Sequence, residues 1–355
     1  MKLLIITQVV NTDDAKLGFF HHWLEEFAKR FESIEVICLE EGRHALPENV
    51  RVHSLGKEHD RHSLKERNST IYGTVMRRIR YLIRFYQHLW KLRSSYDRVF
   101  VHMNPEYVLF AFDLWFLTGK KVALWYNHEV GSFALRLVAP FIHKIFYTSP
   151  YAYTARYTNA KRMPGGIDTT LFAPKELLRT PHCVYMQGRV AVAKKPHLLF
   201  EALRLLKERG VTLTATIVGP IEPPYKVQLH KDFGDLIDGN TILLKGPVRN
   251  EDTPELYASH AVAINLAADG NFDKTVLEAL SCQTPVILSS QAFSDLIPPL
   301  WVVTPDDPSA LALALERFFA LSEDARSHLG KKGRAAVLAQ HSLGALREAL
   351  VRELA

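Results

Sequence analysis

The stretch that decides the fold is Asp269-Gly-Asn-Phe-Asp-Lys-Thr-Val-Leu-Glu-Ala-Leu-Ser-Cys-Gln-Thr-Pro-Val-Ile287. An apolar run of strand length precedes it at 261–266, and a second one, 285–288, ends it. Between the two runs, apolar residues recur with helical spacing from Lys274 onward. The stretch therefore predicts a buried strand, a loop containing glycine, a helix and a second buried strand.

The loop at the start of this predicted helix has the features of an anion-binding site. Free backbone N–H groups and the helix dipole both favour a negative charge at a helix N-terminus. Lys274 adds a positive charge there, and Glu278, one turn further along, accepts hydrogen bonds from hydroxyl groups. Phosphate binding at one end and hydroxyl binding at the other predict a nucleotide-sugar ligand.

Apolar runs of strand length alternate with segments of helical spacing through almost the whole chain. This alternation predicts an α/β fold with parallel sheets. The last strand is expected at 301–303, and two helices, 324–340 and 343–354, are expected to end the chain. A length of 355 residues is comfortable for two domains.

Charge and cysteine content narrow the class of protein. The net charge of +6 favours anionic partners without selecting among nucleotides, nucleic acid and lipid head groups. The three cysteines, Cys38, Cys183 and Cys282, form no CxxC pair, which predicts a reducing, cytoplasmic setting without a structural disulfide or zinc site. No apolar run approaches the roughly 20 residues that span a bilayer.

Several common nucleotide and metal motifs are missing from the sequence. It contains neither a G-x-x-x-x-G-K-[ST] loop nor a G-x-G-x-x-G turn, which argues against an ATPase and against a dinucleotide-dependent oxidoreductase. Histidine, aspartate and cysteine do not occur with metal-ligand spacing. We therefore expect no cofactor and no metal.

Two cations follow the predicted strand 184–188. Arg189 and Lys194 are five residues apart, and both can reach one diphosphate, which is favourable in a partly dry site. They would supply the positive charge that a metal ion supplies in other enzymes.

Further candidate residues lie where predicted strands end. Ligands of open α/β sheets bind outside the carboxyl ends of the strands. His102 and His128 lie at two such ends, and Gly18 precedes the first helix, with His21 and His22 directly after it. A histidine at a strand end also fits a purely structural role, and a lone glycine also fits an ordinary turn.

The stretch 269–287 resembles the E-x7-E region of retaining glycosyltransferases with the GT-B fold, family four of these enzymes (glycosyl transferases group 1). In that family a turn containing Phe binds the donor diphosphate, and the second Glu holds the ribose of the nucleotide. Phe272 matches the Phe and Glu278 the second Glu, so the resemblance implies donor binding by the turn residues Asn271, Phe272, Asp273 and Lys274. The first Glu falls on Gly270, and Asp273 and Lys274 replace a small and an apolar residue.

Other positions extend the resemblance over the chain. Gly188, Arg189 and Lys194 match a G-R-x-x-x-x-K motif whose cations bind the donor diphosphate, and residues 166–172 match a G-[IV]-D-x-x-x-F signature that joins the two domains. The following places are also implied by the resemblance: Gly18 in the loop approaching donor and acceptor, His128 near the donor sugar, and Val248 at the nucleobase.

The resemblance implies an α/β architecture of two Rossmann-like domains facing a cleft. Residues 1–166 would bind the acceptor, residues 167–340 the nucleotide-sugar, and the terminal helix 341–355 would pack back on the first domain. The implied activity is that of a retaining, metal-independent hexosyltransferase that moves a sugar to a glycan or lipid-linked acceptor in polysaccharide biosynthesis. Retention without a protein nucleophile would fit.

Two other functions are consistent with the same residues. The loss of the first Glu at Gly270 would fit a non-catalytic subunit that binds a nucleotide-sugar in a glycan assembly system. A nucleotide-sugar epimerase of similar fold would need further carboxylates and histidines around the sugar.

The predicted helix 72–93 interleaves basic and aromatic residues, which is typical of a surface facing anionic lipid. The alternative is a helix whose aromatic residues pack in the core while its arginines face water. Bacterial members of the family often act on lipid-linked acceptors. We therefore expect peripheral attachment to the inner face of the membrane through this helix, and no nucleic-acid partner.

Overall fold

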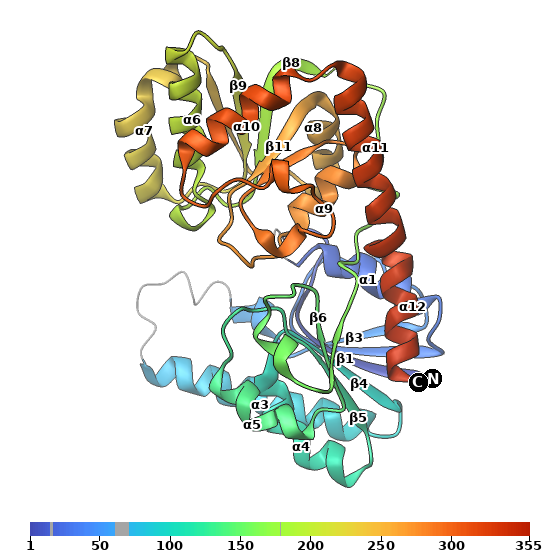
Figure 1. The fold of residues 1–355 in the computed structure, drawn as a ribbon. Helices are drawn as coiled ribbons and strands as arrows, with labels where there is room; N and C mark the ends of the chain where they lie inside the picture. The colour runs from blue at the N-terminus through green and yellow to red at the C-terminus, as the bar shows by residue number, and fades with distance from the viewer. Residues whose placement is uncertain (15–16, 61–70, 178) are drawn as a thin grey trace. The chain divides into compact units, whose positions relative to one another are not determined.

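The computed structural model describes residues 1–14, 17–60, 71–177 and 179–355, which form two compact units (Figure 1). Unit 1 comprises Met1–Met163 together with Leu346–Ala355, and unit 2 comprises Pro164–Ala345. Each unit is built around its own parallel sheet. The α/β class and the parallel sheets predicted from the sequence are therefore confirmed.

Unit 1 contains, among its described residues, a seven-stranded sheet in the order β3-β2-β1-β4-β5-β6-β7. All neighbouring strands are parallel. The strands are β1 (Lys2–Val10), β2 (Ser33–Glu41), β3 (Val50–Ser54), β4 (Arg98–His102), β5 (Lys121–Trp125), β6 (Lys144–Tyr147) and β7 (Ala160–Arg162). The α-helices are α1 (Phe19–Ala28), α3 (Ile71–Leu92), α4 (Pro105–Leu117), α5 (Phe133–Val138) and α12 (Leu343–Leu354).

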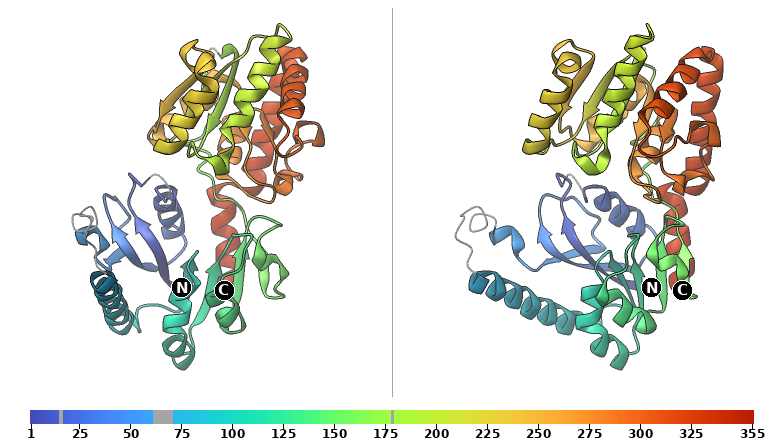
Figure 2. Two further views of the ribbon diagram at one scale, coloured as in Figure 1. Left: turned by 90° about the vertical axis from the view of Figure 1, so that its left-hand side faces the viewer. Right: turned by 60° about the vertical axis from the view of Figure 1, so that its left-hand side comes forward.

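Both faces of this sheet are covered, because side chains alternate between the faces of a strand. Leu4 and Ile6 of β1 belong to a core cluster that includes Phe85 and Leu89 of α3. On the other face, Phe100 of β4 contacts Phe27 of α1, with ring centroids 6.4 Å apart. Figure 2 shows α1 and α3 on opposite faces of these strands.

The last helix, α12, is anchored to unit 1 by polar contacts. Arg347 forms an ion pair with Glu26 of α1. Arg98 of β4 donates from Nε to the carbonyl oxygen of Leu354 at 2.8 Å, and Lys144 of β6 lies 3.2 Å from Glu353. Glu26 and Glu353 are largely buried, so their cationic partners offset the cost of burying a carboxylate.

Unit 2 contains, among its described residues, a five-stranded parallel sheet in the order β10-β9-β8-β11-β12. Its strands are β8 (Thr180–Gln187), β9 (Thr214–Val218), β10 (Ile242–Gly246), β11 (His260–Asn265) and β12 (Val286–Leu288). Its α-helices are α6 (Pro196–Glu208), α7 (Pro223–Asp238), α8 (Thr253–Ser259), α9 (Lys274–Ser281), α10 (Pro308–Ala320) and α11 (Glu323–Gln340). Helix α10 packs against α6, and α11 against α9.

One predicted element of unit 2 is wrong. Residues 301–303 do not form a strand, because a short 3-10 helix, Pro299–Trp301, occupies the start of this segment. Val302 makes a single parallel bridge to Leu288 of β12, and Trp301 packs on Phe318 of α10. The apolar residues of the segment thus pack in the core without extending the ladder.

The strand order places one switch point in each sheet. A switch point is the place where the strand order reverses its direction across the sheet. In unit 2, β9 and β10 lie on one side of β8, and β11 and β12 lie on its other side. In unit 1, β1 lies between β2 and β4 in the same way. Loops diverge at such points and leave a crevice at the carboxyl ends of the strands, where ligands bind in open α/β sheets.

Candidate functional site

The switch point of unit 2 is occupied by the loop between β11 and α9. The loop ends at Asp273, which caps α9: its Oδ1 accepts a hydrogen bond from the backbone N–H of Thr275 at 3.2 Å. Asn265, the last residue of β11, donates from Nδ2 to Oδ2 of Asp273 at 3.2 Å and to Oγ1 of Thr275 at 3.1 Å. The end of the strand thus fixes the start of the helix.

An ion pair joins this loop to the one that follows β8. Lys194 donates from Nζ to Oδ2 of Asp273, and both side chains are largely buried. Burial of the Asp273 carboxylate opposes its ionisation, but the charge and hydrogen bond of Lys194, with smaller contributions from Thr275 and Asn265, hold its pKa below the usual value. The contact brings together two of the predicted donor-binding residues, 79 positions apart in the chain.

Arg189 has a different partner. Its Nη1 lies 3.7 Å from Oε1 of Glu222, and both side chains are about half exposed. Gly188 directly before it has a φ of +140°, and a Cβ atom on Gly219 would lie 1.9 Å from the carbonyl oxygen of Gly188. Glycine is therefore needed at 188 for its backbone conformation and at 219 because the two loops approach this closely.

Glu278 is buried and Lys274 partly buried, near each other on α9. Lys274 donates from Nζ to the carbonyl oxygen of Gly165 at 2.8 Å, and burial lowers its pKa to about 7 despite the nearby Glu278 carboxylate. At neutral pH it therefore carries only part of the positive charge that the sequence suggested. Burial raises the pKa of Glu278 to about 7, with Asp273 adding to the effect, and the Tyr257 hydroxyl donates to its Oε2 at 3.3 Å.

Phe272 is part of the core and lies beneath the loop. Its ring stacks on Phe293, with centroids 4.3 Å apart, and lies 5.5 Å from the ring of His341. Nδ1 of His341 accepts the backbone N–H of Gly165 at 3.0 Å. A Cβ atom on Gly165 would lie 2.5 Å from Leu277, so the signature before the second sheet packs directly on α9.

Gly270, at the place of the first Glu of the motif, has a φ of +84°. A side chain is disfavoured in this left-handed region. Asp269 fixes the turn, because its Oδ1 accepts the backbone N–H groups of Gly270 at 2.9 Å and Gln291 at 2.7 Å. The loop is thus shaped for glycine at this position.

The remaining predicted donor residues of unit 2 lie in neighbouring loops. Asn271 is exposed, and its carbonyl oxygen accepts a hydrogen bond from Oγ of Ser290 at 2.9 Å. Val248 follows β10 and is partly buried against the core of unit 2.

The candidate residues of unit 1 lie at its own switch point or beside it. A Cβ atom on Gly18 would lie 2.7 Å from the carbonyl oxygen of Asp14, so only glycine fits before α1. His128 is exposed in the loop after β5, and its carbonyl oxygen accepts the N–H of Tyr153 at 2.8 Å. His102 is buried, with its ring stacked on Phe20 at 4.5 Å, which favours the structural role for this histidine.

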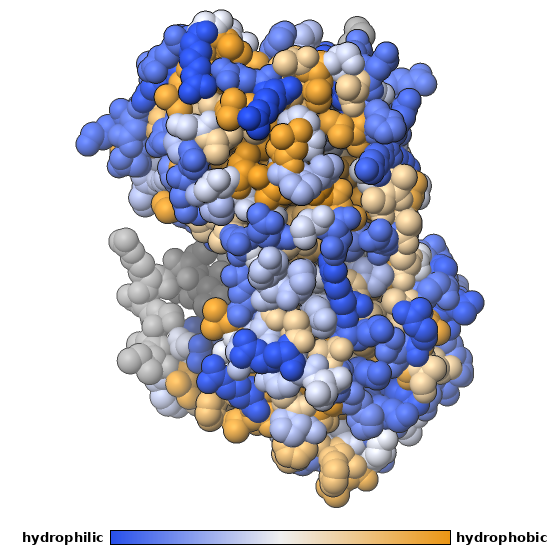
Figure 3. All heavy atoms as spheres, viewed as in Figure 1, coloured by the Kyte–Doolittle hydropathy of each residue, from blue (hydrophilic) through white to orange (hydrophobic). Residues whose placement is uncertain are grey.

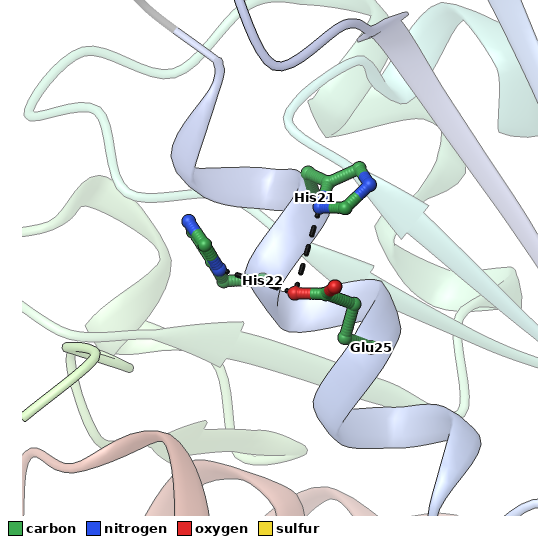
Figure 4. A group of neighbouring side chains, drawn as sticks. All are labelled: His21, His22 and Glu25. Carbon is green, nitrogen blue, oxygen red and sulfur yellow. Dashed lines mark hydrogen bonds and ion pairs between the residues drawn. The ribbon is translucent and has the colours of Figure 1, made fainter. Parts of the chain in front are cut away.

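Among the described residues, one group of side chains is close enough together to hold a metal ion, namely His21, His22 and Glu25 of α1 (Figure 4). Nε2 of His21 accepts the backbone N–H of Ala45 at 3.1 Å, so in the neutral ring Nδ1 carries the hydrogen. That nitrogen faces Oε2 of Glu25 at 3.5 Å and has no lone pair to offer a metal. At this distance Nδ1 of His21 forms no hydrogen bond, whereas Nδ1 of His22 bonds to Oε2 of Glu25 at 3.1 Å. With a protonated Nδ1, His21 is a poor metal ligand, so the group does not fit a metal site.

Sequence reasoning missed the residues that hold the site together. Asn265 and Tyr257 support the loop and Glu278, and His341 approaches from the distant end of unit 2. Asn265 gave one usable signal, since it is a polar residue inside a run of apolar strand residues. The other two carry no motif, and their proximity arises only from the tertiary fold.

Solved structures show what this fold is. HepE from Anabaena, in complex with UDP and glucose, is 16% identical, with a TM-score of 0.75 over 100% of this chain and 99% of that one. Sucrose-phosphate synthase from Thermosynechococcus elongatus is 16% identical, with a TM-score of 0.76 over 99% and 98%. A TarM mutant from S. aureus, in complex with Fondaparinux, alpha-GlcNAc-glycerol and UDP, is 11% identical, with a TM-score of 0.73 over 99% of each chain. The fold is that of GT-B glycosyltransferases, as predicted.

A sequence family described as "Glycosyl transferases group 1" matches residues 181–320. The matched segment includes Arg189, Lys194 and the whole of α9, and thus the residues around the switch point of unit 2. A comparison with curated protein sequences found no match.

The raised pKa of Glu278 gives a prediction for stability. Folding raises this pKa from 4.5 to about 7, so the folded protein binds the proton more tightly than the unfolded chain does. The free energy of unfolding of the wild type, relative to Glu278→Gln, should therefore fall as the pH rises from about 4.5 and level off above about 7, by roughly 3 kcal/mol in total. Urea unfolding of both proteins between these pH values measures the difference, with the exposed Glu208→Gln as a control for the lost charge. A difference that does not change with pH would contradict the assignment.

Proposed function

We propose that the protein is a retaining, metal-independent glycosyltransferase that uses a nucleotide-sugar donor. The observation that carries this proposal is the contact of Lys194 with Asp273, which joins the basic loop after β8 to the N-terminus of α9 at the switch point of the sheet. A diphosphate at this position would meet a cation and the positive end of the helix dipole together.

Each predicted donor residue then has a physical role. Arg189 and Lys194 would stabilise the diphosphate as negative charge develops on the leaving group, and Lys274 would add partial charge and fix the loop. Glu278 would accept hydrogen bonds from the ribose, and backbone groups near Val248 would contact the base. Support comes from structures with this fold, since HepE was crystallised in complex with UDP and with UDP-glucose.

The donor diphosphate would have to compete with Asp273 for Lys194. Without a ligand, the carboxylate of Asp273 already accepts the hydrogen bond of the Lys194 ammonium. A diphosphate that approaches Lys194 also meets the negative charge of Asp273, so donor binding would require this ion pair to open. Asp273 would thereby weaken donor affinity and make it depend on the movement of one side chain.

We assign the acceptor to unit 1 and describe it as a glycan or a lipid-linked glycan. Gly18 and His128, at the carboxyl ends of β1 and β5, would approach acceptor and donor sugar. The transferred group would be a hexose, and retention would proceed without a protein nucleophile. We place the reaction in the cytoplasm, which the three buried free thiols Cys38, Cys183 and Cys282 support.

A second candidate function is that of a subunit that binds a nucleotide-sugar without transferring the sugar. It is favoured by Gly270, whose backbone conformation disfavours any glutamate at this position, and by the neutralised charge of Lys194. Incubation with a panel of nucleotide-sugars separates the two functions. Release of nucleoside diphosphate with an acceptor supports transfer, binding without release supports the subunit, and an isomerised sugar would indicate an epimerase.

The roles of the two cations predict a loss of turnover on substitution. Arg189→Ala and Lys194→Ala should each lower kcat about a hundredfold, because one charge-stabilising group at the leaving group contributes on the order of 3 kcal/mol. The matched control is Lys195→Asn, which removes the neighbouring cation that pairs with Asp306 and keeps a residue tolerant of its φ of +51°. Thermal unfolding of each variant confirms that the fold persists. Wild-type turnover in a folded double variant would rule out the proposed roles.

Competition between Asp273 and the diphosphate predicts a gain in affinity. Asp273→Ser removes the negative charge and keeps a residue that can cap α9. Isothermal titration with UDP should show binding up to about tenfold tighter than in the wild type, equivalent to about 1.4 kcal/mol. Glu222→Gln, at the exposed partner of Arg189, should change the affinity much less. An Asp273→Ser affinity equal to or weaker than that of the wild type would mean that Asp273 does not compete for the site.

A further inference from the structure

Helix α3 of unit 1 carries an exposed apolar stripe along almost its whole length. Met76, Ile79, Ile83, Tyr86 and Trp90 follow one another at alternating spacings of three and four residues, and all five are exposed. The opposite face of the helix is buried in the core of unit 1 through Phe85, Leu89 and Leu92. Since the helix already packs on the sheet with that second face, the exposed stripe is not required for folding.

The stripe continues onto the two neighbouring helices. The hydroxyl of Tyr86 donates to the carbonyl oxygen of Phe110 in α4, and Phe112 of α4 contacts Phe141 beside α5 with ring centroids 5.0 Å apart. At the end of α4, Phe116 and Leu117 are 75% and 82% exposed. Figure 2 shows α3 and α4 side by side on the same side of unit 1, and Figure 3 shows apolar residues gathered at its lower edge.

The charges on α3 itself have one sign, whereas α4 contributes the exposed Asp113, which lies near Tyr86. Residues 71–92 contain five cations, Arg77, Arg78, Arg80, Arg84 and Lys91, and no acid. Two of them serve the fold, because Arg80 bonds to Asp60 and Arg84 donates to the carbonyl oxygen of Leu55. Arg78 and Lys91 are exposed, and Arg93 just beyond the helix stacks on the ring of Trp90 at 4.6 Å. Arg80 and Arg84 are therefore engaged in contacts within unit 1.

We propose that α3, α4 and α5 form a docking surface for an anionic lipid bilayer. A helix with a long apolar face, cations beside it and a tryptophan and tyrosine at its edge lies in the plane of a membrane interface. The charge selects this occupant over a second copy of the chain, because two copies paired along α3 would bring ten helix cations together without an acid on either helix. Phe116 and Leu117 insert into the acyl boundary, and Arg78, Lys91 and Arg93 contact the phosphates. None of the helices in the described part of the chain combines the length and the apolar character that a bilayer span needs.

The molecule contains its own fluorescent probe of this surface. Trp90 is 62% exposed, whereas the other four tryptophans, Trp23, Trp115, Trp125 and Trp301, are buried. With vesicles rich in phosphatidylglycerol, the full-length protein should show a blue shift of emission and protection from acrylamide quenching. Both changes should be lost in Trp90→Phe and be much weaker with phosphatidylcholine vesicles alone.

Two sets of substitutions separate the apolar and charged contributions. Phe116→Ser with Leu117→Ser should lower co-sedimentation with these vesicles at least tenfold, because each removes a largely exposed apolar side chain from the inserted edge. Arg78→Gln with Lys91→Gln should lower it about 25-fold at low salt, about fivefold for each cation. The matched control is Val227→Ser, at a 71% exposed apolar residue of α7 in unit 2, which should bind as the wild type does.

Three results would overturn the proposal. The first is that the wild type does not bind anionic vesicles at low salt. The second is that the Phe116→Ser, Leu117→Ser protein binds them as well as the wild type does. The third is a dimer in sedimentation that Ile83→Ser dissociates and that vesicles do not dissociate. Nucleotide binding by unit 2 does not depend on this surface. The docking variants should therefore bind UDP as the wild type does, and failure of one proposal remains distinguishable from failure of the other.

Discussion

A parallel sheet has to be buried on both of its faces, and this constraint determines where the chain can place a site. Each strand of the two sheets is followed by a connection that covers one face or the other. The first strand of each sheet, β1 in unit 1 and β8 in unit 2, has a neighbouring strand on both sides. The connections to these two neighbours run in opposite directions and leave the carboxyl ends of the strands open. At that opening in unit 2, the sheet offers no hydrogen-bond partner to the backbone N–H groups of the loops and of α9. Side chains take that place, as Asp273 does for Thr275.

At this opening in unit 2, the Lys194–Asp273 pair supports the local structure and lies where the proposed donor would bind. Asp273 caps α9, receives a hydrogen bond from Asn265 and pairs with Lys194, so its carboxylate organises a strand end, a helix start and a second loop. Removing either partner would leave a largely buried charge without compensation. The same arrangement withholds Lys194 from an anionic ligand until the pair opens. If this loop binds a diphosphate as proposed, a single substitution at position 273 would change both the stability of the loop and its affinity for that ligand.

The sequence predicted the elements of the fold well because period-2 and helical spacings survive in buried strands and amphipathic helices. The sequence also predicted the loop before α9 and the two cations after β8, because glycine and charged residues directly after an apolar run mark a loop at a strand end. The ionisation of Lys274 and Glu278 could not be predicted from the sequence. Their pKa values depend on burial by segments that are distant in the chain, such as those of Gly165 and Tyr257. The segment 301–303 was misassigned because three apolar residues pack equally well in a core without pairing along a strand.

The loop departs from the E-x7-E pattern at Gly270, but it still carries a carboxylate, at Asp273. At position 270 the loop has a φ of +84°, where glutamate would be strained, and the side chain of Asp269 is held by two backbone N–H groups. The loop nevertheless keeps a carboxylate three residues later, at Asp273, where it bonds to Lys194. A carboxylate at the first position would act on a sugar, whereas one beside Lys194 acts on a diphosphate. Selection among donors in this protein would therefore depend less on sugar hydroxyl contacts from this loop, and more on whether the diphosphate can displace Asp273.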